Sequence, residues 1–215
     1  MPTPHRFNRA QLESELEQYP WEAWFQLERW KERNSDLEAI INSAVAGNTF
    51  RAFHHMPHPP ARTFRDWAIG AIDSRGLKSM QSVTSQSEYT DWLYQLGEDF
   101  RRFWKQEMRK EMDFGRSLKL LNLLAKRLCI YREIQVEEFR RIVRFLEVPL
   151  DSYTIQAVAN CNVINKRIPL SATMSFVEDL PTYEEFQRGI RQLAEGVGVP
   201  AIAFECLAWD AGHAK

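Results

Sequence analysis

Residues 114–126 read Phe-Gly-Arg-Ser-Leu-Lys-Leu-Leu-Asn-Leu-Leu-Ala-Lys, and residues 148–153 read Val-Pro-Leu-Asp-Ser-Tyr. Leucine recurs at helical spacing through the first stretch, which predicts a helix that opens at Gly115. In the second stretch Pro149 holds the chain extended, and helical spacing resumes directly after it. Asp151 is therefore expected to cap the N-terminus of a new helix.

The rest of the chain has the same helical periodicity, with no run of alternating apolar and polar residues. The sequence therefore predicts an all-α protein. Ser85 and Thr182 each precede a glutamate by three residues, which is typical of a capping box at a helix start. The expected helices span residues 9–19, 21–33, 35–47, 63–74, 85–113, 115–131, 136–146, 151 onward, 182–196 or 198, and 200–209.

The length of 215 residues allows one large or two small domains. Residues 54–60 hold three prolines, so we expect a loop at 54–62 within an N-terminal helical lobe of residues 1–84. Residues 85–215 would form the second helical domain. Apolar runs are too short to span a bilayer, and the N-terminus lacks the pattern of a secretory signal. We expect a soluble, cytoplasmic, monomeric protein.

Metal and thiol chemistry are disfavoured. Prolines separate His54 and His55 from His58 and no carboxylate accompanies them, so we expect a surface loop and no metal or cofactor. The cysteines are odd in number and have no Cys-x-x-C pattern, which predicts reduced core residues: Cys129, Cys161 and Cys206. Three early tryptophans have helical spacing and are expected to serve packing: Trp21, Trp24 and Trp30.

The charge is unevenly distributed. The whole chain has a net charge of −1, but residues 101–150 hold thirteen Lys or Arg against seven Asp or Glu. A local excess of +6 favours contact with nucleic acid phosphates. The basic side chains expected to meet phosphates are Arg101, Arg102, Lys105, Arg109, Lys110, Arg116, Lys126 and Arg127.

Lys119 lies near the start of the leucine-rich helix. Burial and the positive end of the helix dipole both disfavour an ammonium there, and both lower the pKa of a lysine towards a nucleophilic amine. Lys119, Asn122 and Lys126 share one stripe of the helix. That stripe also fits a solvent-facing edge, and Asp151 taken alone also fits a simple helix cap.

Taken together, these residues resemble the catalytic core of the helix-hairpin-helix DNA glycosylases, in which a lysine follows the hairpin and an aspartate follows a Val-Pro-Val-Asp type of turn. The separation of 32 residues between Lys119 and Asp151 resembles the archaeal 8-oxoguanine glycosylase branch and its bacterial relatives. Residues 200–209, Pro-Ala-Ile-Ala-Phe-Glu-Cys-Leu-Ala-Trp, resemble the C-terminal helix of that branch, with glutamate at 205 where aspartate is more usual. The resemblance covers residues 85 to 210.

The resemblance implies a two-lobed helical fold with a cleft between the lobes. It implies excision of a flipped, modified base, with Asp151 stabilising the sugar cation and Lys119 as amine nucleophile or auxiliary group. A Schiff base would add AP lyase activity. Trp209, Glu205 and Pro149 would line the base pocket. Arg116 and Ser117 would hold a phosphate of double-stranded or locally unpaired DNA, because the usual Leu-Pro-Gly-Val-Gly hairpin is reduced here to residues 114–117.

No cysteine quartet for an iron–sulfur cluster is present, and the first 80 residues lie outside the resemblance. 8-Oxoguanine is the default substrate by resemblance. Two alternatives stay open: an antiphage glycosylase that removes a hypermodified base from invading DNA, and a catalytically inert helical module that binds DNA or protein.

Overall fold

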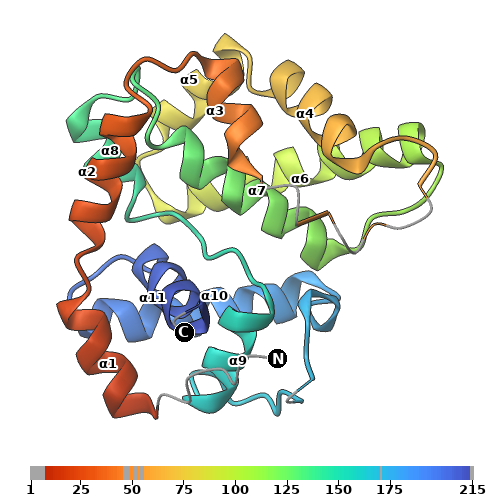
Figure 1. Cartoon of the computed structure of the whole chain (residues 1–215). Coiled ribbons are helices and arrows are strands. Elements are labelled where there is room, and N and C mark those ends of the chain that lie inside the picture. The colour runs from red at the N-terminus through yellow and green to blue at the C-terminus, as the bar shows by residue number, and fades with distance from the viewer. Residues whose placement is uncertain (1–7, 46–48, 51–52, 54–55, 170, 214–215) are drawn as a thin grey trace. The chain divides into compact units, whose positions relative to one another are not determined.

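The computed structural model describes residues 8–45, 49–50, 53, 56–169 and 171–213 (Figure 1). These residues form eleven α helices and a short 3-10 turn, with no strand among them, so the all-α prediction is confirmed. The helices are α1 Arg9–Gln18, α2 Trp21–Lys31, α3 Leu37–Ala44, α4 Pro60–Ala71, α5 Ser74–Ser82, α6 Gln86–Met108, α7 Phe114–Leu128, α8 Val136–Ile142, α9 Ser152–Asn160, α10 Leu180–Gly196 and α11 Ile202–His213, and the 3-10 turn is Met174–Phe176. No described helix is long and apolar enough to cross a membrane.

The sequence did not predict α5. The helix expected at 63–74 would end before Gly76, but this glycine lies inside α5, where a Cβ atom would collide with the backbone of Ala71. The glycine therefore permits a close approach of α5 to the end of α4. Asp73 starts α5 by accepting hydrogen bonds from the N–H groups of Arg75 and Gly76. The preceding helix begins at Pro60, before the predicted Thr63, because proline is tolerated in a first helical turn.

Several predicted caps are confirmed and two are wrong. Ser85 and Asp151 cap α6 and α9 as expected. The helix expected at 35–47, with Ser35 as its cap, is α3, and its cap is Asp36. Helix α10 is capped by Asp179, whose carboxylate accepts from the N–H of Thr182, so Thr182 lies in the first turn and does not start the helix. In both corrected helices an aspartate provides the acceptor for the exposed N–H groups.

The chain forms two compact units, and neither is continuous in sequence. Unit 1 contains Met1–Trp24, Asp113–Lys119 and Leu146–Lys215, and unit 2 contains Phe25–Met112 and Leu120–Phe145. The predicted division at residues 84 and 85 differs from this one. Helix α1 belongs to unit 1 because it packs against α10 and α11, far along the chain.

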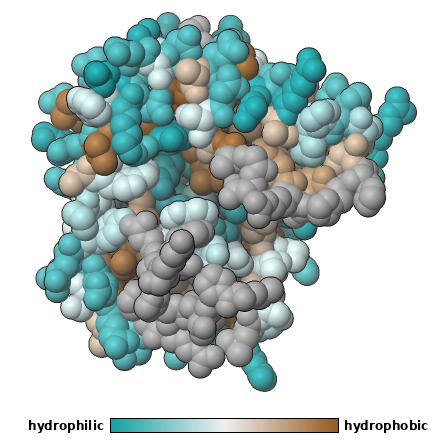
Figure 2. Space-filling view, in the orientation of Figure 1, coloured by the Kyte–Doolittle hydropathy of each residue, from teal (hydrophilic) through white to brown (hydrophobic). Residues whose placement is uncertain are grey.

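Unit 2 is built around α6, which packs against α4 and α5. The rings of Phe64 and Trp67 from α4 lie 5.4 and 4.6 Å from that of Phe100, and the Trp67 indole N–H donates to Asp99 at 2.9 Å. Over α4 the face in Figure 2 is largely hydrophilic, as expected for a helix that buries one apolar side.

The packing prediction for the early tryptophans is wrong for Trp30. Its side chain is 62% exposed, and the Arg33 guanidinium lies over its ring at 4.4 Å, whereas Trp21 and Trp24 are half-buried. The reason is that the buried side of α2 is the one that carries Phe25, whose ring contacts that of Phe139. The cysteine prediction is confirmed, since Cys129, Cys161 and Cys206 are free thiols in the core. Burial raises the pKa of Cys161 to about 11.

In unit 1, helices α1, α9, α10 and α11 pack together (Figure 1). Tyr183, Phe186 and Phe204 are fully buried within it. Gly189 of α10 lies so close to Val163 and Ile164 that a side chain would not fit there. These contacts fix α10 against the chain segment that follows α9.

Candidate active site

The start of α7 is held by both its cap and its packing. Asp113 accepts a hydrogen bond from the N–H of Arg116 at 2.7 Å, and its carbonyl accepts from the N–H of Ser117 at 3.1 Å. At Gly115 a Cβ atom would collide with the backbone of Met174 and Val177. The first turn of α7 therefore lies directly on residues 174–177, and Lys119 follows one turn later.

Asp151 is held at the opposite side of the site by the cap of α9. Its Oδ1 atom accepts from the N–H groups of Tyr153 at 2.9 Å and Thr154 at 3.0 Å. The Thr154 hydroxyl in turn accepts from the N–H of Asp151 at 2.7 Å, which completes a capping box. The cap thus occupies one carboxylate oxygen and fixes the direction of the other.

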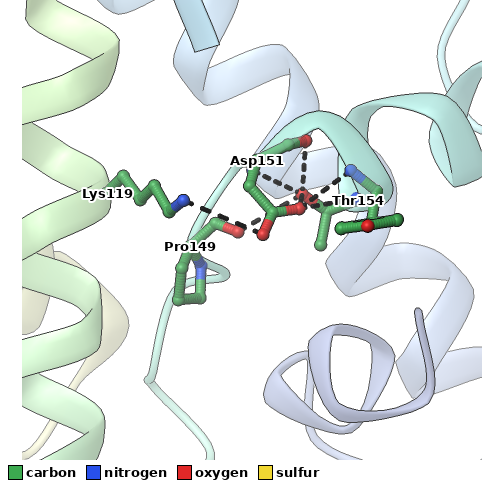
Figure 3. Close-up of polar contacts among 5 residues, drawn as sticks. Lys119, Pro149, Asp151 and Thr154 are labelled. Carbon is green, nitrogen blue, oxygen red and sulfur yellow. Dashed lines mark hydrogen bonds and ion pairs between the residues drawn. The ribbon is translucent and has the colours of Figure 1, made fainter. Parts of the chain in front are cut away.

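That second oxygen faces Lys119 (Figure 3). The Lys119 Nζ atom lies 3.9 Å from Asp151 Oδ2, and each side chain is 13% exposed. The distance is too long for a hydrogen bond, so the two groups attract each other electrostatically. The predicted pair is therefore brought together within unit 1.

The pKa of Lys119 is lowered from its ordinary value. Burial is the largest cause, and the negative charges of Asp151 and Glu205 oppose it. Lys119 thus has a larger neutral fraction than a solvent-exposed lysine at the same pH.

The residues predicted to line a base pocket also belong to unit 1. Trp209 of α11 is 41% exposed, and its ring meets that of Tyr153 edge to face at 6.0 Å. Glu205 is buried, and the Cys206 thiol donates to its Oε2 atom at 3.6 Å. Pro149 is buried, and its carbonyl accepts from the Thr154 hydroxyl at 3.3 Å. An exposed indole therefore stands beside the helix that Asp151 caps.

Two residues predicted to hold a phosphate have other roles. Ser117 is fully buried and its hydroxyl donates to the carbonyl of Phe114 at 2.7 Å, so it is not available to DNA. The Arg116 guanidinium is half-buried and lies 3.1 Å from the carboxylate of Asp113. Both side chains stabilise the first turn of α7, a role that the sequence spacing does not distinguish from phosphate binding.

The remaining predicted DNA contacts belong to unit 2, among them Arg109, Lys126 and Arg127. The Arg127 guanidinium lies 2.7 Å from Glu28 and 3.8 Å from Glu32, so it is engaged in ion pairs with α2. Arg109 is exposed and ends α6 in the left-handed conformation, with a φ angle of 52°. Lys126 is half-buried. Of these three side chains, that of Arg109 is the most accessible to a phosphate, because it is exposed.

Sequence reasoning missed the residues that support the Val-Pro-Leu-Asp segment. Gln187 pairs through its amide with both backbone groups of Val148. Glu147, which is buried, accepts from the Tyr183 hydroxyl at 2.7 Å. The available signal was a glutamine beside Phe186 and Ile190 on the buried side of α10, since a buried amide needs partners.

No group of three or more His, Cys, Asp or Glu among the described residues could hold a metal ion; His54 and His55 lie outside the described residues. Comparison of the chain with protein-family models, curated proteins and solved structures finds no match. Function is therefore inferred from the chemistry of the site.

Proposed function

We propose that the protein is a DNA N-glycosylase that excises a modified base, with Lys119 and Asp151 as its catalytic residues. The observation that carries the proposal is the pair itself: a buried amine with a lowered pKa, 3.9 Å from a carboxylate oxygen that the α9 cap leaves unused. An amine that can lose its proton, beside a fixed carboxylate, is suited to attack on an electrophilic sugar carbon.

In the first step the N-glycosidic bond breaks and its electron pair leaves with the base, which takes up a proton. The Asp151 carboxylate stabilises the positive charge that develops on the sugar. Lys119 in its neutral form then bonds through Nζ to C1′ and gives its extra proton to the carboxylate or to solvent. Opening of the sugar ring yields a Schiff base, from which loss of a 2′ proton expels the 3′ phosphate.

The target nucleotide must leave the base stack before this chemistry, because C1′ and the base are not accessible in a duplex. Trp209 supplies an exposed aromatic face for the flipped base. The partner is double-stranded or locally unpaired DNA, and Arg109 and Lys126 are proposed phosphate contacts. No cofactor is needed for these steps.

The proposal includes the finer fold that the sequence resemblance implies, a two-lobed helix-hairpin-helix glycosylase with a cleft between its lobes. The default substrate is an 8-oxoguanine-like base. Hypermodified bases of phage DNA form a second substrate class, which the borohydride assay described next also tests.

The test is reduction of the Schiff base with borohydride on duplex DNA that contains 8-oxoguanine or a hypermodified base. We expect a covalent complex with the unaltered protein and none with Lys119→Gln. Lys78→Gln, which removes an exposed lysine of α5, serves as the matched control and should be trapped normally. Excision without trapping would indicate a water nucleophile. Salt-sensitive DNA binding without excision of any base would replace the proposal with an inert binding module.

A further inference from the structure

Helix α10 has a line of polar side chains on a side that faces the interior of unit 1. Tyr183, Gln187 and Arg191 are spaced four residues apart, so they share one side of the helix. Tyr183 and Gln187 are buried and Arg191 is half-buried. Polar groups in such a place are costly unless they have partners, so their contacts show what they stabilise.

Gln187 binds the backbone of Val148 as a neighbouring strand would. Its Oε1 atom accepts from the N–H of Val148 at 2.8 Å, and its Nε2 atom donates to the carbonyl of Val148 at 2.8 Å. Val148 is fully buried, so water cannot replace these bonds. One side chain thereby satisfies both backbone groups of an extended residue, three positions before Asp151.

Tyr183 and Arg191, on either side of Gln187, contact the segment before Asp151, and Tyr183 also contacts the start of α7. The Tyr183 hydroxyl donates to Glu147 at 2.7 Å, and the Arg191 guanidinium lies 3.8 Å from the other oxygen of that carboxylate. The ring of Tyr183 also meets that of Phe114 edge to face at 6.0 Å. Phe114 is the first residue of α7, the helix that positions Lys119. One side of α10 therefore contacts the chain just before each member of the pair.

We propose that Gln187 is a positioning residue, which acts through Val148 to set the distance between the Asp151 carboxylate and the Lys119 amine. This inference rests on the proposed function. Gln187 makes no described contact with either catalytic side chain, so it is not itself catalytic. At 3.9 Å the pair is already at the limit of an ion pair, so a small shift of residues 148–151 would separate it. Misplacement of about 1 Å can cost a catalytic step about 100-fold.

The first test compares Gln187→Met with Gln192→Met. Both replace a glutamine of α10 by a side chain of similar length without hydrogen-bonding groups, but Gln192 is exposed. Single-turnover excision of 8-oxoguanine from a duplex should slow 10- to 100-fold in Gln187→Met, with the Kd for that duplex unchanged within twofold. Gln192→Met should match the unaltered protein. An unchanged excision rate in folded Gln187→Met would overturn the proposal.

A second variant covers the case in which Gln187→Met does not fold. Gln187→Glu keeps an acceptor for the N–H of Val148, and its protonated form also keeps a donor for the carbonyl. Its excision rate relative to the unaltered protein should therefore rise as the pH falls from 8 towards 6. A constant ratio would count against positioning through Val148.

A readout without DNA separates this inference from the proposed function. The pKa of Lys119 can be followed by NMR of ¹³C-dimethylated lysines, with its signal assigned by its absence in Lys119→Gln. Asp151 raises that pKa, so its displacement in Gln187→Met should lower it, while Gln192→Met leaves it unchanged. A lowered pKa in a protein that excises nothing would retain the positioning role and reject the glycosylase. Normal excision with an unmoved pKa would reject the positioning role alone.

Discussion

Helix α7 contributes to two partly buried ion pairs that differ in geometry. Arg127 lies 2.7 Å from Glu28 with a direct hydrogen bond, whereas Lys119 lies 3.9 Å from Asp151 without one. Burial alone would raise the pKa of Glu28, but hydrogen bonds from Lys31 and Arg127 outweigh it and lower that pKa. In the other pair burial dominates and lowers the pKa of Lys119. The short pair favours the charged carboxylate of Glu28, while the long pair leaves the Lys119 amine able to lose its proton.

The largest expected effect is on the excision rate, and it distinguishes the Lys119–Asp151 pair from the Arg127–Glu28 pair. Asp151→Asn should reduce the excision rate by about 100-fold or more, the usual contribution of a positioned acid or base. Asparagine caps helices nearly as well as aspartate, so thermal unfolding should change little. Glu28→Gln, the matching change in the short pair, should leave excision unaltered. Retained excision in Asp151→Asn would remove Asp151 from the mechanism.

The pH dependence of trapping should report the lowered pKa of Lys119. Because the neutral amine is the nucleophile, the trapping rate should rise about tenfold per pH unit below that pKa and level off above it. The plateau should begin below the ordinary lysine value of 10.5. A rate that still rises at pH 10.5 would show an amine with an ordinary pKa.

Both lowered pKa values make the free energy of unfolding rise with pH, but in two different pH windows. The folded-state pKa of Lys119 is depressed, so the unfolded chain binds more protons and stability rises with pH between that pKa and 10.5. The pKa of Glu28 is also depressed, so its contribution is complete above 4.5 and is lost as the pH falls through the folded-state pKa. Urea unfolding of Lys119→Gln and Glu28→Gln across both pH windows should show each dependence disappear separately.

Substitution of Gly115 tests whether the first turn of α7 depends on close packing in unit 1. A methyl group there would collide with the backbone of Met174 and Val177, so Gly115→Ala should cost about 1–3 kcal/mol. Gly70→Ala in α4 meets open space and should stabilise the protein by about 0.5–1 kcal/mol. Urea denaturation measures both. Equal effects of the two variants would contradict the close approach at Gly115.

A smaller loss of stability than that of Gly115→Ala is expected when the short pair is broken. Arg127→Gln should lower the free energy of unfolding by about 1–2 kcal/mol, between the values for exposed and fully buried ion pairs. Arg62→Gln removes an exposed pair with Asp66 and should change stability by no more than about 0.5 kcal/mol. If DNA affinity falls strongly in Arg127→Gln at unchanged stability, Arg127 contacts phosphate after all.

Local signals gave correct predictions where a few neighbouring residues decide the outcome. The cap at Asp151 and the all-α class follow from residue type and spacing within one or two turns. The missed helix α5 shows the limit of such signals. Gly76 ends helices in many contexts, but here it is needed inside a helix because the Ala71 backbone passes close to it.

The sequence by itself determined the helices other than α5, the cap that fixes one oxygen of Asp151, and the placement of Lys119 in an early turn of α7. Only the tertiary structure decided that their side chains meet 3.9 Å apart and that Gln187 supports the intervening segment. It also decided that Ser117 and Arg127 are engaged within the protein. The physical reason is range: helix propensity and capping act over about four residues, whereas burial and ion pairing depend on which distant segments pack together.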